Sequence, residues 1–113
     1  MKKEIEELPE VLTSLVNSQN AKDSATFVLC FSEDAKVYDE GHTYSGKKEI
    51  RTWNEETTKK YDTYIKAQEY EVKVAAHIVT FQVSGKFDGS PIDLKYDFKI
   101  SGSLITALTI TSV

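Results

Sequence analysis

Residues 31–53, FSEDAKVYDEGHTYSGKKEIRTW, decide the fold that the sequence predicts. This stretch indicates the end of a helix, a turn, a short strand over residues 36–39, a loop and the start of another helix. The strand ends in a carboxylate, Asp39, and the loop holds His42 three residues later. Two titratable groups at this spacing favour either the mouth of a cavity or a solvated loop.

Helical patterns lie on both sides of this stretch. Apolar residues at three-to-four spacing predict a first helix through Ile5, Leu8, Leu12, Leu15 and Val16. Pro9 either begins that helix or kinks it. After a polar break at residues 20–23, a second short helix is expected through Phe27, Val28 and Phe31. Ser45-Gly46 opens a third helix, one face of which carries Ile50, Trp53, Thr57 and Tyr61.

The second half of the chain changes to a period of two. Alternation is strictest over residues 92–100, and similar patterns predict strands over 64–74, 77–83 and 104–110. Helices followed by antiparallel strands indicate an α+β fold, with helices on one face of a curved sheet.

The last predicted strand, residues 104–110, is apolar on both sides. Leu104, Leu108 and Ile110 are assigned to one face, and Ile105, Ala107 and Thr109 to the other. Such a strand is either central in the sheet or covered by a second subunit. We favour a homodimer formed through the outer face of the sheet.

Composition limits the classes of function. The 113 residues suit one domain, residues 1–113, and a formal charge of −4 disfavours nucleic acid as a partner. No apolar run suits a secretory signal or a membrane span, so no membrane partner is expected. The only cysteine, Cys30, lies in an apolar run and is expected to be buried. A cytoplasmic location fits a chain that cannot form an internal disulfide.

The run FSEDAKVYDEG, followed by YSGKKEIRTW and then by antiparallel strands, resembles the nuclear transport factor 2-like superfamily and, within it, the SnoaL-like group. The resemblance extends from Leu8 to Ile110. It implies a cone-shaped α+β barrel, with three N-terminal helices packed in a curved antiparallel or mixed sheet around a deep pocket. The superfamily contains isomerases, dehydratases, cyclases, epoxide hydrolases, binding modules and dimerisation domains, so the fold alone does not give the function.

The resemblance also implies catalytic residues. In the similar Δ5-3-ketosteroid isomerases, an aspartate at the strand position that matches Asp39 carries a proton between carbons. A carboxylate in an apolar cavity has a raised pKa and can accept and return a proton. One oxyanion donor of those isomerases falls at Leu15, which cannot donate, and the other falls at Tyr96, which can. His42 is expected to relay protons to Asp39 or to be an exposed loop residue.

The remaining candidates are binding residues. A pocket would be lined by large apolar or aromatic side chains, for which we name Leu15, Trp53, Tyr61, Tyr64, Phe81 and Phe98. The alternative is that the aromatic residues simply fill the core. Arg51, which an epoxide hydrolase arrangement would require, is expected to face solvent. The spacing of Asp39, Glu40 and His42 matches no metal-ligand pattern, so neither a metal nor a cofactor is expected.

Two functions follow from these residues. The first is a cofactor-independent isomerase, cyclase or dehydratase that acts on a hydrophobic, ring-containing small molecule by proton transfer through Asp39. The alternative is a non-catalytic module of the same fold that binds a small ligand or mediates dimerisation.

Overall fold

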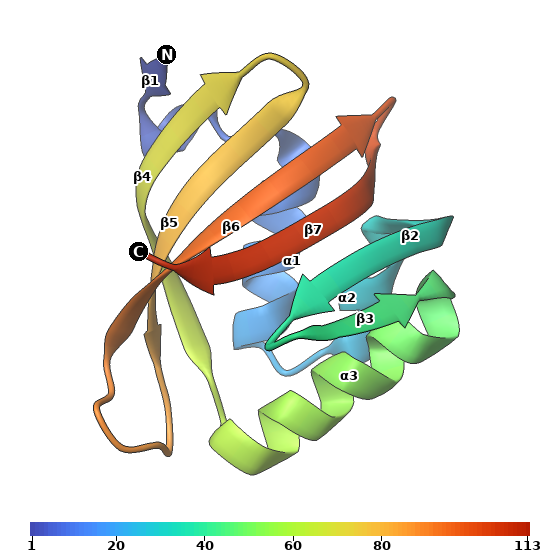
Figure 1. The fold of residues 1–113 in the computed structure, drawn as a ribbon, viewed down its shortest axis with the longest axis vertical. Helices are drawn as coiled ribbons and strands as arrows, with labels where there is room; N and C mark the ends of the chain where they lie inside the picture. The colour runs from blue at the N-terminus through green and yellow to red at the C-terminus, as the bar shows by residue number, and fades with distance from the viewer.

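A seven-stranded sheet and the helices packed against it make up an α+β fold (Figure 1). The computed structural model describes residues 1–113. The helices are η1 (Ile5–Glu7, a 3-10 helix), α1 (Glu10–Asn20), α2 (Ser24–Leu29) and α3 (Gly46–Tyr61). The strands are β1 (Lys2–Lys3), β2 (Phe31–Asp39), β3 (His42–Ser45), β4 (Tyr64–Lys73), β5 (Ala76–Ser84), β6 (Ile92–Ser101) and β7 (Leu104–Ser112).

The strands follow the order β1-β4-β5-β6-β7-β2-β3. All neighbours are antiparallel except β2 and β7, which pair in parallel because the helices and the β4–β7 meander separate them in the chain. The N-terminal strand β1 pairs with β4. This strand was not predicted from the sequence, because two residues are too short to show an alternating pattern. No helix is long and apolar enough to cross a membrane.

The structure decides between the two alternatives for Pro9, and it shows that the predicted first helix does not include Ile5 and Leu8, which lie before α1. Pro9 is the N-cap of α1, so it begins the helix and does not kink it. A proline costs little there, because the first N–H groups of a helix have no intrahelical partner. The side chain of Asp23 caps α2 by accepting a hydrogen bond from the backbone N–H of Thr26 at 3.1 Å.

The prediction that α2 runs through Phe31 is wrong, because β2 already begins at that residue. Phe31 pairs with Ile105 of β7, and the Ile105 N–H donates to the Cys30 carbonyl at 2.9 Å. These contacts join segments more than seventy residues apart, so local propensity could not reveal them. A bulge between Phe31 and Lys36 separates this first pairing from the remainder of the strand.

The predicted loop around His42 is the short strand β3. Asp39 pairs with His42, and the two-residue turn between them is formed by Glu40 and Gly41 at φ 52° and 77°. Positive φ at both central positions is the geometry of a type I′ hairpin turn, which matches the twist of the flanking strands. The hairpin therefore places Asp39 at the very end of β2.

A second bulge corrects the faces assigned to the last strand. Lys99 pairs with Ala107 but Ile100 pairs with Ile105, so Thr106 is the extra residue. A one-residue insertion reverses the side-chain alternation. Ile105 therefore lies on the inner face with Leu108 and Ile110, and all three are buried.

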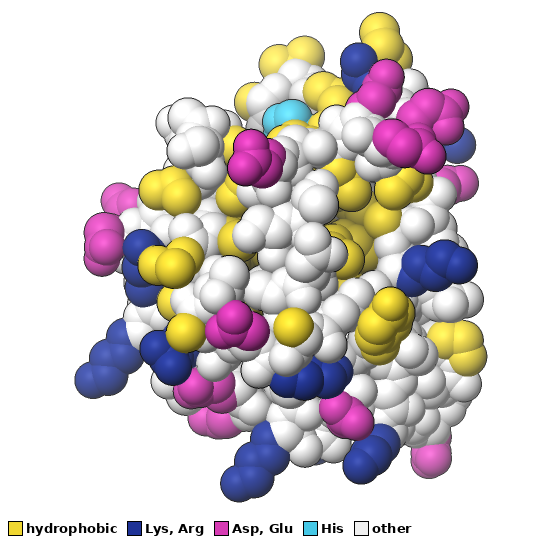
Figure 2. Space-filling model, turned by 180° about the vertical axis from the view of Figure 1, so that it is seen from behind, with side chains coloured by type: hydrophobic (Ala, Val, Ile, Leu, Met, Phe, Trp, Pro, Cys, Tyr) yellow, Lys and Arg dark blue, Asp and Glu magenta, His cyan; other side chains and the backbone are white.

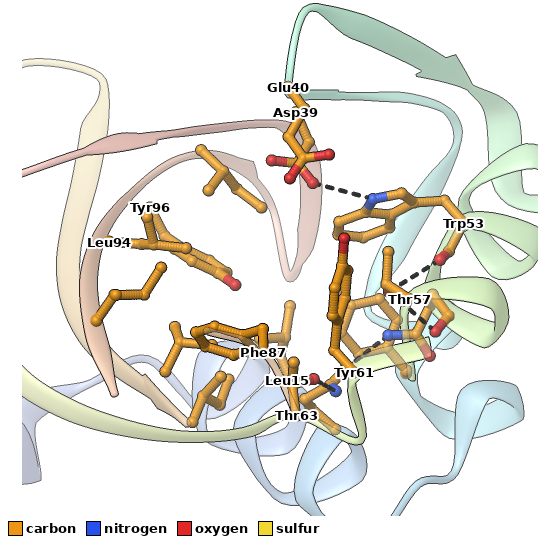
Figure 3. A pocket seen from close by; sticks show the side chains of 17 residues that line it. Leu15, Asp39, Glu40, Trp53, Thr57, Tyr61, Thr63, Phe87, Leu94 and Tyr96 are labelled. Atoms are coloured by element: carbon orange, nitrogen blue, oxygen red, sulfur yellow. Dashed lines mark hydrogen bonds between the residues drawn. The ribbon is translucent and has the colours of Figure 1, made fainter. Parts of the chain in front are cut away.

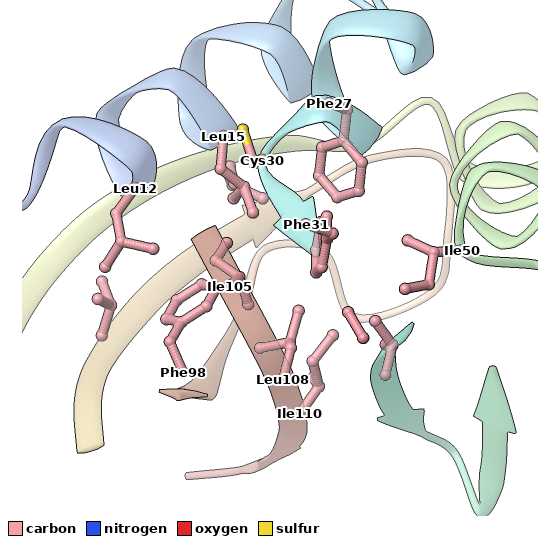
Figure 4. Close-up of a cluster of buried hydrophobic side chains, with 14 of the residues drawn as sticks. Leu12, Leu15, Phe27, Cys30, Phe31, Ile50, Phe98, Ile105, Leu108 and Ile110 are labelled. Atoms are coloured by element: carbon pink, nitrogen blue, oxygen red, sulfur yellow. The ribbon is translucent and has the colours of Figure 1, made fainter. Parts of the chain in front are cut away.

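The core lies between the helices and the inner face of the sheet (Figure 4). Leu12, Leu15 and Phe27 of the helices face Phe98 and Leu108 of the strands, and none is more than 4% exposed. Full burial of a side chain of this size contributes roughly 1.5–3 kcal/mol. The rear surface carries acidic and basic side chains interspersed, with hydrophobic side chains visible in hollows between them (Figure 2).

Candidate functional site

A cavity of about 230 Å³ lies beside the core, between the C-terminal half of α3 and the inner face of the sheet (Figure 3). Seventeen residues line it, and eleven of them are hydrophobic. Its rim includes the turn residue Glu40, Phe87 of the β5–β6 connection and Ile92, the first residue of β6. A mostly apolar cavity with a few polar groups is the usual form of a small-molecule site.

Asp39 stands at one end of this cavity because β2 ends there. The indole Nε1 of Trp53, on α3, donates a hydrogen bond to Asp39 Oδ2 at 3.2 Å. Burial raises the pKa of the Asp39 carboxyl above its ordinary value, and the charge of Glu40 acts in the same direction. The Trp53 hydrogen bond and the proximity of His42 lower the pKa in part. The carboxyl group is thus tuned toward proton exchange.

Tyr96 reaches the same cavity from β6 and points its hydroxyl into it (Figure 3). Its ring packs edge-to-face on Phe81, with 4.8 Å between centroids. Burial raises the pKa of Tyr96 far above its ordinary value, and the charge of Asp39 raises it further. The phenol therefore stays protonated at neutral pH and is available as a hydrogen-bond donor.

A polar cluster closes the cavity at the end away from Asp39. Gln19 of α1 donates from Nε2 to Thr63 Oγ1 at 2.9 Å and accepts from Asn54 Nδ2 of α3 at 2.6 Å. Gln19 and Asn54 are only 7% and 4% exposed, and all three residues line the cavity. The sequence prediction missed this cluster. Gln19 could have been found, since it lies four residues after Leu15 on the same helical face.

The comparisons with known proteins agree with this geometry. A protein from Sinorhizobium meliloti proposed to be a polyketide cyclase superimposes with a TM-score of 0.91 at 28% identity, covering 96% of this chain and 100% of that one. A protein of ketosteroid isomerase-like fold from Catenulispora acidiphila, in complex with trimethylamine, has a TM-score of 0.81 at 17% identity (93% and 87% covered). A cystatin-fold protein from Novosphingobium aromaticivorans has a TM-score of 0.75 at 17% identity (90% and 95% covered).

This chain has the nuclear transport factor 2-like fold. The resemblance read from residues 8–110 is therefore confirmed at the level of the fold. Neither a model of a known protein family nor a curated protein matches the sequence at a significant level.

Five of the side chains predicted from the sequence meet in the cavity of this nuclear transport factor 2-like fold: Leu15, Asp39, Trp53, Tyr61 and Tyr96. Four different elements supply them: α1, β2, α3 and β6. Leu15 lies low in the cavity as an apolar wall and offers no hydrogen bond.

Three predicted binding residues do not line the cavity. Phe81 and Phe98 are 0% exposed and belong to the core. Tyr64 is 55% exposed, because Ile65 takes the inward position beside it and neighbouring strand residues face opposite ways. A bulge between Ala67 and Glu69 then brings Tyr70 inward, so Tyr64 and Tyr70 lie on opposite faces of β4 although their positions differ by an even number.

The other titratable candidates also lie outside the cavity. His42 is exposed and its ring is near Tyr44, with 6.4 Å between centroids. The second histidine of the chain, His77 of β5, does not line the cavity either, and its Nδ1 shares a 2.8 Å hydrogen bond with the hydroxyl of Tyr70. Arg51 is exposed and pairs with Glu55 at 3.3 Å, as expected for a residue that faces solvent. No group of three or more His, Cys, Asp or Glu side chains could hold a metal ion.

Proposed function

We propose that this protein catalyses a cofactor-independent proton transfer on a small ketone of one or two rings, as an isomerase or cyclase does. The observation that carries the proposal is that Asp39 and Tyr96 share one apolar cavity. The first is a carboxyl group of raised pKa, and the second is a phenol that stays protonated. We also infer that the curved sheet and its three helices form a cone that opens beside Asp39.

The two side chains have complementary roles. Asp39 removes a proton from a carbon next to the carbonyl group, and the electron pair of that C–H bond forms an enolate. Tyr96 donates a hydrogen bond to the enolate oxygen, and protonated Asp39 then returns the proton to another carbon. Each role accelerates such reactions by a known factor. Positioned acid–base catalysis contributes about 10²–10⁴-fold in rate, and one oxyanion donor contributes about 10²–10³-fold.

The cavity volume sets the size of the ligand. A dry cavity of about 150 Å³ is enough for benzene. The 230 Å³ here leaves room for a second ring or for substituents on one ring. The similarity to a proposed polyketide cyclase supports a ring-forming or ring-containing substrate.

Hydrogen–deuterium exchange tests the proposal without knowledge of the natural substrate. The probe is 2-tetralone, a two-ring ketone, in D₂O, with exchange next to the carbonyl followed by NMR. We expect the wild-type protein to accelerate exchange. The accelerated rate should fall about 10²–10⁴-fold in Asp39→Asn and about 10²–10³-fold in Tyr96→Phe. Asp93→Asn, an exposed carboxylate on β6, is the control and should exchange like the wild type. A wild-type rate equal to that of buffer would contradict the proposal.

A second candidate is ligand binding without turnover. It is favoured by Leu15, which stands where the similar isomerases have a donor and leaves Tyr96 as the remaining one. The Catenulispora neighbour holds trimethylamine, so a protein of this fold can bind a very small molecule. In this case 2-tetralone would raise the melting temperature of the wild type and of Asp39→Asn equally, with no exchange above buffer.

A further inference from the structure

The polar cluster of Gln19, Asn54 and Thr63 has hydrogen-bonding capacity that the protein does not use. Gln19 Nε2 donates to Thr63 and, at 3.5 Å, to Thr58, and Gln19 Oε1 accepts from Asn54. The amide of Gln19 is therefore fully engaged on its donor side. By contrast, the side-chain oxygen Oδ1 and the second side-chain N–H of Asn54, and the O–H of Thr63, have no protein partner.

The free oxygen of Asn54 faces the cavity, which Thr63 also lines. No buried side-chain nitrogen or oxygen of the protein lacks a hydrogen bond, so an unpartnered Asn54 oxygen must border open space. Asn54 is only 4% exposed and lines the cavity, so the space that it borders is the cavity itself. The side-chain amide of Gln19 lies between Asn54 and Thr63 and bonds to one of them through each of its two polar atoms. These two bonds fix the orientation of both side chains.

The cluster is at the opposite end of the cavity from the acid–base pair. In Figure 3, Thr63 lies at the floor, whereas Asp39 and Tyr96 lie above it, with the ring of Tyr61 along one wall. The walls between the two ends are mainly hydrophobic. A ligand that fills this cavity meets polar groups at both ends and apolar groups between them.

We propose that Asn54 and Thr63, positioned by Gln19, select ring ketones that carry a hydroxyl or another hydrogen-bonding group on the side opposite the reacting carbonyl. This inference rests on the proposed function and names its substrate class: a ring system with polar groups at both ends. A hydroxyl suits the cluster because it can donate to the Asn54 oxygen and accept from the Asn54 N–H or from the Thr63 hydroxyl.

A matched pair of probes tests the inference by binding alone. Trp53 is the only tryptophan and lines the cavity, so its fluorescence reports binding of 2-tetralone and of 6-hydroxy-2-tetralone. We expect the hydroxylated probe to bind the wild type about 5–10-fold more tightly, the value of one added hydrogen bond. Asn54→Leu should reduce this ratio to about one.

Two further variants separate selection from a structural role. Thr63→Val keeps the shape of the side chain and should also lower the ratio, which covers the case in which Asn54→Leu does not fold. Asn20→Ala is the control: Asn20 ties α1 to the backbone of Ile65 through bonds of 2.9 and 2.8 Å but does not line the cavity. It should reduce stability and leave the ratio unchanged.

Equal affinities of the two probes for the wild type, or no binding of either, would overturn the inference. So would a ratio that Asn54→Leu and Thr63→Val leave intact. Because the readout is binding, the inference can fail while exchange at the carbonyl is still accelerated. The proposed catalysis can equally fail while the ratio is as expected.

Discussion

The indole N–H of Trp53 donates to the carboxylate of Asp39 across 3.2 Å, and this hydrogen bond joins the middle of α3 to the end of β2. It fixes the one carboxyl group of the cavity that burial tunes toward proton exchange. It also opposes that tuning, because a hydrogen bond to the charged form lowers the pKa. The chemistry of Asp39 therefore depends on a residue fourteen positions away in the sequence.

Replacement of Asp39 by Asn should stabilise the protein at neutral pH. Burial raises the pKa of folded Asp39 above 3.8, so the protonated form favours the folded state and ionisation disfavours it. The stabilising contribution is full below pH 3.8 and is lost as the pH rises through the folded-state pKa. Denaturant unfolding of both proteins over a pH series should show the advantage of Asp39→Asn growing through that window and then levelling.

Asp23 is the matched control of opposite sign. The hydrogen bonds from Thr26 lower the pKa of Asp23, so its contribution is present above pH 3.8 and is lost as the pH falls through its lowered pKa. Asp23→Asn should therefore destabilise the protein at neutral pH. An equal loss of stability in Asp23→Asn and Asp39→Asn at pH 7 would contradict the conclusion that burial raises the pKa of Asp39.

Replacement of Trp53 by Phe should shift the pH dependence of catalysis. The variant loses the hydrogen bond that holds the pKa of Asp39 down, so that pKa rises and the base is protonated up to a higher pH. The acidic limb of the pH–rate profile for 2-tetralone exchange should move to higher pH. Tyr44→Phe, which removes a hydroxyl near Trp53 but keeps the indole, should leave the limb in place.

Phe98 and Tyr64 should respond differently to truncation, although both were expected to bind ligand. Phe98 is 0% exposed in the core, so Phe98→Ala should cost about 3–5 kcal/mol of unfolding free energy. Tyr64 is exposed, so Tyr64→Ala should change stability by about 0.5 kcal/mol or less and leave 2-tetralone affinity unchanged. Chemical denaturation and fluorescence titration measure the two effects. A loss of affinity in Tyr64→Ala would restore it as a binding residue.

We propose, as the sequence led us to expect, that two copies associate through the outer face of the sheet. The inward turn of Ile105 leaves Ala107 and Thr109 of β7 on that face, beside Asp97 and Lys99 of β6. Small residues next to charges of both signs allow close self-association. A stable contact needs about 800 Å² from each partner. Light scattering should give a dimer for the wild type and a monomer for Ala107→Glu; a monomeric wild type would contradict the proposal.

The cavity shows how far a site can be predicted from sequence. Asp39 and Tyr96, which both line the cavity, were predicted because a strand-end carboxylate and a strand tyrosine match positions in a known superfamily. Asn54 and Thr63 carry no such signal, since a polar residue on a helix or in a connection is usually solvated. Asn54 is buried and Thr63 half-buried in the cavity because Gln19, from a distant helix, bonds to both and brings them together.

The sequence by itself determined the α+β class, the polar break that ends in the capping residue Asp23, and the nuclear transport factor 2-like fold, and it limited Pro9 to the start of a helix or a kink. Hydrophobic period, capping residues and proline act within a few residues of their own position, so they can be read locally. Only the tertiary structure decided that Phe31 lies in a strand, that Ile105 turns inward and that Tyr64 faces outward. Each depends on a bulge or on a pairing between distant segments, where one inserted residue reverses the faces of a strand.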